Sequence, residues 1–148
     1  MFSIGPNNLE TYVHHFGNHG VYYTRDFVTP IPVTSSVTII INPQADVSKF
    51  FDICELYSQV YDAAGNEIQD ETISSVRFYN DYQDTGTITL TNNVNLRKRF
   101  RKWRWNIFRD GKARLKNPYL FVTLNFENNN NKRLVLHHLI TSFRLRPF

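Results

Sequence analysis

The sequence predicts an all-β protein, a single antiparallel β-sandwich with the jelly roll as one arrangement of it. Val, Ile, Thr, Tyr and Phe dominate the composition, and these residues fit the half-buried surface of a sheet. Ala is scarce and Met occurs once, so strong helix formers are few. Apolar and polar residues alternate over short stretches that turn residues separate, which indicates strands. The 148 residues suffice for one domain with a proper core.

Two regions are expected along the chain. Residues 1–34 form an irregular N-terminal arm, because glycines and prolines at positions 5, 6, 17, 20, 30 and 32 interrupt any long element. Residues 35–148 form the β-sandwich domain. With Met1 as its start, we expect the chain to fold by itself.

The predicted strands of the sandwich share a period of two, with turn residues between them. The alternation is clearest after residue 53, where Cys54, Leu56, Ser58 and Val60 lie on one face. Four consecutive asparagines at 128–131 predict a hairpin loop. The strands are predicted at residues 36–42, 53–62, 75–79, 86–91, 119–127 and 134–145.

The charges divide into an acidic and a basic segment. Residues 96–116 hold ten of the seventeen Lys and Arg residues, both tryptophans and one acid, a net charge of +9. Residues 52–84 carry eight acids and one base, a net charge of −7, in a protein whose total is +4. Such a division predicts contact with something charged, either nucleic acid or another protein subunit.

The basic segment also alternates, and this alternation bears on nucleic-acid binding. Cations that neutralise phosphates and aromatic rings that stack on bases suit a single strand. On a β-strand, however, Trp103 and Trp105 face the core while Lys102 and Arg104 face outward. The tryptophans are then unable to stack on a base. A protein interface or a solvated face is favoured, and nucleic acid stays open as the less favoured alternative.

No pattern predicts catalysis, a metal site or a cofactor. The histidines fall in two groups, and adjacent histidines of one strand point apart, so converging ligands are not expected. The acids at 52–84 lack the local signature of any enzyme class. Cys54 is the single cysteine, which excludes an internal disulfide and predicts a small core residue. The histidines are His14, His15, His19, His137 and His138.

A carbohydrate-binding module is a competing hypothesis, because β-sandwiches bind sugars through exposed aromatic rings and amides. Sixteen asparagines and the tyrosines at 22, 23, 79 and 82 fit it loosely. The alternative is that tyrosines at strand ends pack against turns.

No stretch approaches the roughly 18 apolar residues of a membrane span. The first ten residues lack the basic start and apolar stretch of a signal peptide. We therefore expect a soluble protein made in a reducing cytosol.

Several short motifs, in their order and spacing, resemble those of large structural proteins of crAss-like bacteriophages, over roughly residues 14–146. The longest is VRFYNDYQDTG at 76–86, and the basic RFRKWR at 99–104 is another. The others are FFD at 50–52, SQVY at 58–61, RLKNPY at 114–119 and LHHLI at 136–140.

The resemblance implies the carboxy-terminal β-domain of a tail component, of the muzzle or tail-stabilisation kind. Such a domain is a non-enzymatic structural part of the virion, with no catalytic residue to carry over. Its partners are other virion proteins, it forms a homo-oligomer in the particle, and it is made in the cytoplasm of the host bacterium.

The candidate partner interface combines outward cations of the basic segment with two tyrosines of the arm. We expect the cations to meet an acidic patch on a neighbouring subunit, and the arm to order against a partner. The alternative is that the opposite charges pair within one domain. The predicted interface residues are Arg97, Arg99, Arg101, Lys102, Arg104, Tyr22 and Tyr23.

Overall fold

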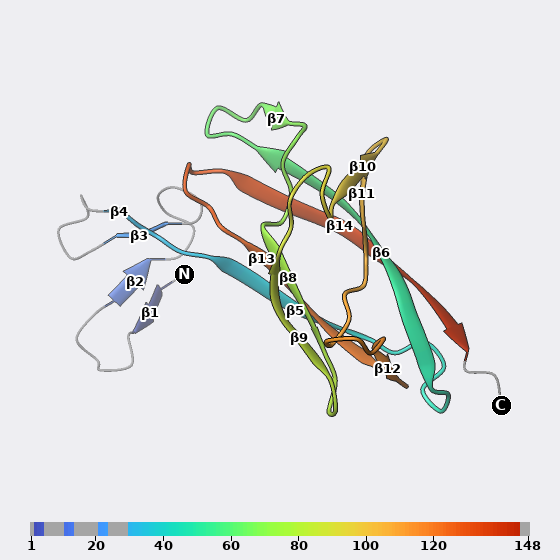
Figure 1. Ribbon diagram of the computed structural model, residues 1–148. Coiled ribbons are helices and arrows are strands. Elements are labelled where there is room, and N and C mark those ends of the chain that lie inside the picture. The colour runs from blue at the N-terminus through green and yellow to red at the C-terminus, as the bar shows by residue number, and fades with distance from the viewer. Residues whose placement is uncertain (1, 5–10, 14–20, 24–29, 146–148) are drawn as a thin grey trace.

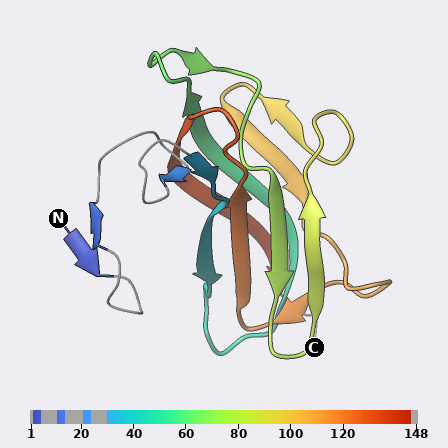
Figure 2. The ribbon, with the colours of Figure 1, turned by 90° about the vertical axis from the view of Figure 1, so that its left-hand side faces the viewer.

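The protein is an all-β sandwich, as the sequence predicts. The computed structural model describes the backbone of residues 2–4, 11–13, 21–23 and 30–145, and the side chains from residue 31 to residue 145. Within these ranges every regular element is a strand and all paired strands are antiparallel. The strands of the main body form two facing sheets (Figures 1 and 2). This part of the chain contains no helix long and apolar enough to cross a membrane.

The first sheet has four strands. Its order is β5 (Ser35–Ile41), β13 (Leu120–Phe126), β8 (Ser75–Tyr79) and β9 (Asp84–Thr89). Strands β8 and β9 form a hairpin whose turn holds residues 80–83. Strand β13 pairs with β5 on one side and with β8 on the other, so strands far apart in the sequence are neighbours in this sheet.

The second sheet is built on β6 (Lys49–Tyr61). Along one side of β6 runs β14 (Arg133–Leu145), with two register shifts at which the strand bends. Along the other side lie three strands in succession, and β10 pairs with the second of them. They are β12 (Lys116–Asn117), β11 (Lys102–Asn106) and β7 (Glu67–Ile68), and β10 spans Arg97–Arg99.

The described parts of the first 34 residues form two short pairs of strands. Strand β1 (Phe2–Ile4) pairs with β2 (Thr11–Val13), and β3 (Val21–Tyr23) pairs with β4 (Pro30–Pro32). Each of these four described strands is three residues long. The division at residue 35 into an arm and a domain stays a prediction.

The core lies between the inner faces of the two sheets. The predicted alternation is confirmed in β6, where Cys54, Leu56, Ser58 and Val60 are buried, and it holds in β13 as well. Alternate residues of a strand point to opposite faces, so the intervening side chains are partly exposed. The large apolar side chains that are almost completely buried include Trp103, Trp105, Phe78, Leu56, Leu115, Leu120 and Leu124.

Strand β6 begins at Lys49, four residues before the predicted start, and a buried lysine explains the difference. The Lys49 ammonium donates hydrogen bonds to the carbonyl oxygens of Gln44, at 2.8 Å, and Pro118, at 2.5 Å. Burial lowers the pKa of Lys49. A lone lysine is a weak strand signal, and its burial requires acceptors such as these, of which Pro118 lies far along the chain.

Candidate partner-binding surface

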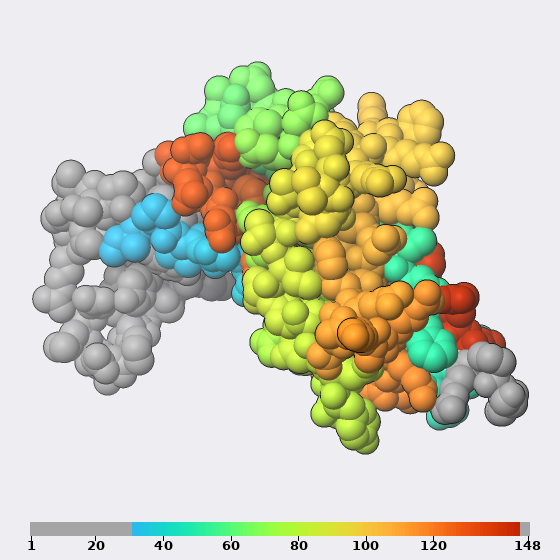
Figure 3. Space-filling view, in the orientation of Figure 1, coloured from blue at the N-terminus to red at the C-terminus, as the bar shows by residue number. Residues whose placement is uncertain are grey.

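Strands β10 and β11 form a tight basic hairpin, which projects from the body of the sandwich (Figures 1 and 3). Arg99 pairs with Lys102, so Phe100 and Arg101 are the two residues of the turn. Phe100 has a φ of 58°, in the left-handed region, and its side chain is 91% exposed. Two-residue hairpin turns favour glycine where φ is positive, and an L-residue there costs about 1–2 kcal/mol. A bulky apolar residue is thus presented to solvent at an energetic cost.

The hairpin also brings like charges together. Arg97 lies directly opposite Arg104, and Arg99 lies directly opposite Lys102. Like charges in opposite positions on paired strands repel each other and destabilise the pair. The folded chain therefore carries a concentration of positive charge that an anionic partner would relieve.

The other face of β11 belongs to the core. Trp103, which is 2% exposed, lies opposite Leu56 of β6, and Trp105 lies opposite Cys54. The outward Lys102 and Arg104 lie opposite Tyr57 and Glu55. The tryptophans are therefore structural residues, and neither is able to stack on a base.

Part of the acidic segment is neutralised within the domain, as one of the alternatives predicted. Strand β11 lies beside β6, and this brings the basic and acidic segments together. Five ion pairs join basic residues to acids of residues 52–84 from elsewhere along the chain. They are Arg104–Glu55 at 3.8 Å, Arg114–Asp52 at 3.3 Å, Arg144–Asp52 at 2.6 Å, Lys98–Asp70 at 3.8 Å and Lys132–Glu71 at 2.6 Å.

Four of the five predicted interface cations take no part in these ion pairs. Arg97, Arg99, Arg101 and Lys102 make no ion pair with any residue that the structure describes. Arg104 is the exception, because of Glu55. The two predicted tyrosines, Tyr22 and Tyr23, belong to β3, and their side chains lie outside the described residues.

A cleft of about 450 Å³ lies beside the hairpin, on the outer face of the second sheet. Its walls come from three elements: the β10–β11 hairpin, Glu55 and Tyr57 of β6, and His138 of β14. The Tyr57 ring stacks on His137 with a centroid distance of 4.5 Å and lies 5.5 Å from His138. The cleft therefore combines aromatic surface with a rim of cations. The hairpin contributes Arg99, Phe100, Arg101, Lys102 and Arg104 to it.

Sequence reasoning missed Phe100, Tyr57 and His138. A signal for Phe100 was available, because a large apolar residue between two arginines breaks the alternation at a turn. Tyr57 and His138 gave no such signal, because their place in the cleft depends on the pairing of β14 with β6.

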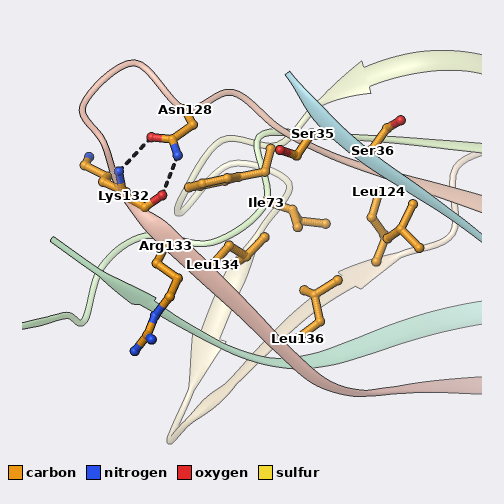
Figure 4. Close-up of a pocket in the computed structure, with 11 residues that line it drawn as sticks. Ser35, Ser36, Ile73, Leu124, Asn128, Lys132, Arg133, Leu134 and Leu136 are labelled. Atoms are coloured by element: carbon orange, nitrogen blue, oxygen red, sulfur yellow. Dashed lines mark hydrogen bonds between the residues drawn. The ribbon is translucent and has the colours of Figure 1, made fainter. Parts of the chain in front are cut away.

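A second hollow, of about 260 Å³, opens between the edges of β5 and β14 (Figure 4). Ile73, Leu124 and Leu134 form much of its apolar lining. Two of its polar residues are engaged with each other: the Asn128 side chain accepts a hydrogen bond from the Lys132 amide and donates one to its carbonyl oxygen. The Lys132 ammonium binds both carboxylate oxygens of Glu71 at 2.6 Å.

Two other groups of candidate residues are a tyrosine considered for sugar binding and the histidines. Tyr79, a candidate sugar-binding residue, stacks on Phe121 at 4.9 Å and lies under the Arg77 guanidinium. His14, His15 and His19 lie outside the described residues. Within those residues no three His, Cys, Asp or Glu side chains converge as metal ligands would.

A family model matches residues 27–110, a span that includes β5 to β11 and hence both the basic hairpin and the β6 wall of the cleft. The model describes the Crassvirus muzzle protein C-terminal domain. The chain belongs to this family. The resemblance seen in the sequence is thereby confirmed, and the chain is a structural component of a phage virion. No curated protein matches the chain.

Proposed function

We propose that the chain is a non-enzymatic tail component of a crAss-like phage, which binds other virion proteins through the β10–β11 hairpin. It is made in the host cytoplasm and forms a homo-oligomer in the particle. Membership of the muzzle family supports the virion role. The single observation that carries the interface is the set of cations around exposed Phe100, of which Arg97, Arg99, Arg101 and Lys102 have no acidic partner among the described residues.

The chemistry of the surface fits a protein partner with an acidic patch. Exposed aromatic and Arg side chains are the residues that dominate binding energy at protein interfaces. Unpaired rim cations steer an acidic partner and set its orientation. Tyr22 and Tyr23 of β3 belong to the proposed interface as the contribution of the arm.

Reversal of two hairpin charges tests the proposal. In Arg99→Glu/Arg101→Glu, the carboxylate introduced at position 99 would face Lys102 across the hairpin. The unfolding free energy should therefore stay the same or rise by up to about 1 kcal/mol, while incorporation into virions should fall strongly. Arg104 is left intact, because its reversal would oppose Glu55 within the fold. The measurement is the copy number of the variant in purified particles, beside urea unfolding of the isolated chain.

The matched control is Arg109→Glu/Lys112→Glu, which makes the same change in net charge on the exposed loop between β11 and β12. This control leaves the hairpin intact, so it should be incorporated at least as well as the wild-type chain. Normal incorporation of the hairpin variant would show that its cations do not hold the chain in the particle.

Single-stranded nucleic acid is the second candidate partner, and the unpaired cations beside Phe100 are the observation that favours it. Glu55 within the cleft and the burial of both tryptophans oppose it. Binding of this kind should weaken steeply with salt, in proportion to the number of phosphates contacted. Fluorescence titration of an oligonucleotide at two salt concentrations distinguishes it from a protein interface.

A further inference from the structure

The β8–β9 turn carries a second exposed aromatic residue. Tyr82 is 83% exposed, so Tyr82 and Phe100 are the two most exposed large hydrophobic side chains among the described residues. The Asn80 side-chain oxygen accepts hydrogen bonds from the backbone N–H groups of Tyr82 and Gln83, both at 2.9 Å. The backbone N–H of Asn80 donates to the Gln83 carbonyl oxygen at 2.9 Å. These bonds fix the backbone of the Tyr82 tip (residues 80–83).

The Tyr82 tip carries the charge opposite to that of the hairpin. Asp81 precedes Tyr82, accepts a hydrogen bond from the Tyr119 hydroxyl and makes no ion pair among the described residues. The Arg77 guanidinium, in the same hairpin, donates a hydrogen bond to the Asp84 carboxylate. This bond lowers the pKa of Asp84 to about 2. The tip therefore presents an aromatic ring beside a carboxylate that no cation of the described residues neutralises.

The two tips lie at opposite ends of the sandwich. Figures 1 and 2 place the β10–β11 hairpin at the upper end and the β8–β9 turn at the lower end, and Figure 3 shows both projecting from the body. They are unable to meet within one molecule. Two complementary surfaces at opposite ends of a chain can meet between copies, and such head-to-tail contacts generate closed rings or open filaments.

We propose that the Tyr82 tip of one copy inserts into the cleft beside Phe100 of the next copy. The Tyr82 ring lies against Phe100 and Tyr57, and Asp81 meets Arg99 and Arg101. Both surfaces are already formed in the single chain, so little conformational entropy is lost on association. This contact rests on the proposed function, because it identifies a second copy as the partner of the same hairpin.

Positive charge near the tip limits the strength of the contact. The loop between β11 and β12 packs beside the tip, since the Gln83 side chain donates to the Arg114 carbonyl oxygen at 3.0 Å. Arg114 is paired with Asp52, but Arg109 and Lys112 of this loop have no acidic partner among the described residues and repel the hairpin of the next copy. Association of the isolated chain should therefore be weak and concentration-dependent.

A mixing experiment with two aromatic truncations tests the head-to-tail arrangement. Tyr82→Ala removes the tip and Phe100→Ala removes the cleft wall, and each side chain is exposed, so both variants should fold normally. Each variant alone should associate at least about tenfold more weakly than the wild-type chain. The two variants mixed should form heterodimers, because one intact tip then meets one intact cleft, but nothing larger than a dimer.

Sedimentation velocity over a concentration series measures these outcomes, with circular dichroism to verify folding. A wild-type chain that stays monomeric at its highest soluble concentration overturns the proposal. So does association that either truncation leaves unchanged, or a mixture that stays monomeric although the wild-type chain associates.

Incorporation into virions distinguishes failure of the contact between copies from failure of the proposed function. If Tyr82→Ala enters particles normally while Arg99→Glu/Arg101→Glu does not, the hairpin binds a different virion protein, and only the contact between copies fails. If both variants enter normally, the proposed function fails as well.

Discussion

Phe100 is informative because its place in the fold is unfavourable. A phenylalanine with a φ of 58° and 91% exposure contributes neither a relaxed backbone nor a buried ring to the isolated chain. Asn93 and Asn131 also have positive φ, but asparagine tolerates the left-handed region better than phenylalanine does. Backbone strain in combination with exposure is typical of a residue that acts on a partner.

The first prediction at this scale is that Phe100→Gly separates folding from assembly. Glycine adopts positive φ without strain, although it loses more entropy on folding. The unfolding free energy should be unchanged or raised by up to about 1 kcal/mol, while self-association should be lost. Urea unfolding and sedimentation measure the two effects. A loss of stability greater than about 1 kcal/mol would contradict a strained Phe100.

At the scale of elements, the β10–β11 hairpin contributes both to the core and to the charged surface, because its apolar and basic residues alternate. Trp103 and Trp105 close the core, and the residues between and before them place cations on the outer face. Strand β11 is held by its backbone pairing with β6 and by the burial of its two tryptophans, so the charged face is fixed in place although its own charges repel.

Trp103→Ala should therefore destabilise the domain by about 3–5 kcal/mol, through lost burial and the cavity that remains. Chemical denaturation followed by circular dichroism is the measurement. The matched control is Phe100→Ala at the tip of the same hairpin, which should change the unfolding free energy by less than about 0.5 kcal/mol. Similar losses for both variants would mean that the ring of Phe100 is buried rather than exposed.

Across the whole molecule, Asp52 joins three distant segments. Its carboxylate lies in β6, the Arg144 guanidinium of β14 binds it with two hydrogen bonds of 2.6 and 2.9 Å, and Arg114 approaches to 3.3 Å. The hydrogen bonds from Arg144 are the largest cause of the lowered pKa of Asp52, and its burial acts in the opposite direction. Ion pairs between the acidic segment and cations from two other parts of the chain therefore also stabilise the fold.

The pH dependence of Asp52→Asn follows from this direction. A carboxyl whose pKa is lowered on folding stabilises the fold above its ordinary value, here 3.8, and the stabilisation is lost as the pH falls through the lower folded value. The variant should be less stable than the wild-type chain at neutral pH, and the difference should shrink well below pH 3.8. Urea midpoints along a pH series measure it.

The control is Asp46→Asn, which removes an exposed carboxylate that makes no ion pair among the described residues. Its urea midpoint at neutral pH should match that of the wild-type chain. An Asp52→Asn midpoint equal to the control would mean that the ion pairs of Asp52 do not contribute to folding.

The longer strands, their buried faces and the concentration of positive charge are predictable from the sequence, whereas the short strands such as β7, β10 and β12 were not predicted. Alternation has a period of two that the extended backbone imposes, so Leu56 and Trp103 were identifiable as core residues without any knowledge of their partners. The predicted start of β6 was wrong by four residues. The strand begins at Lys49, whose burial depends on acceptors in two separate loops and not on the local sequence pattern.

Which strands pair is known only from the folded molecule, and the candidate site depends on that pairing. The placement of β11 beside β6 neutralises Arg104 and leaves Arg99 without an acidic partner among the described residues. The pairing of β14 with β6 adds His138 to the cleft, and the packing of the sheets sends Tyr82 and Phe100 to opposite ends. Such pairings join residues far apart along the chain, and no local periodicity encodes them, because many pairings bury the same alternating faces.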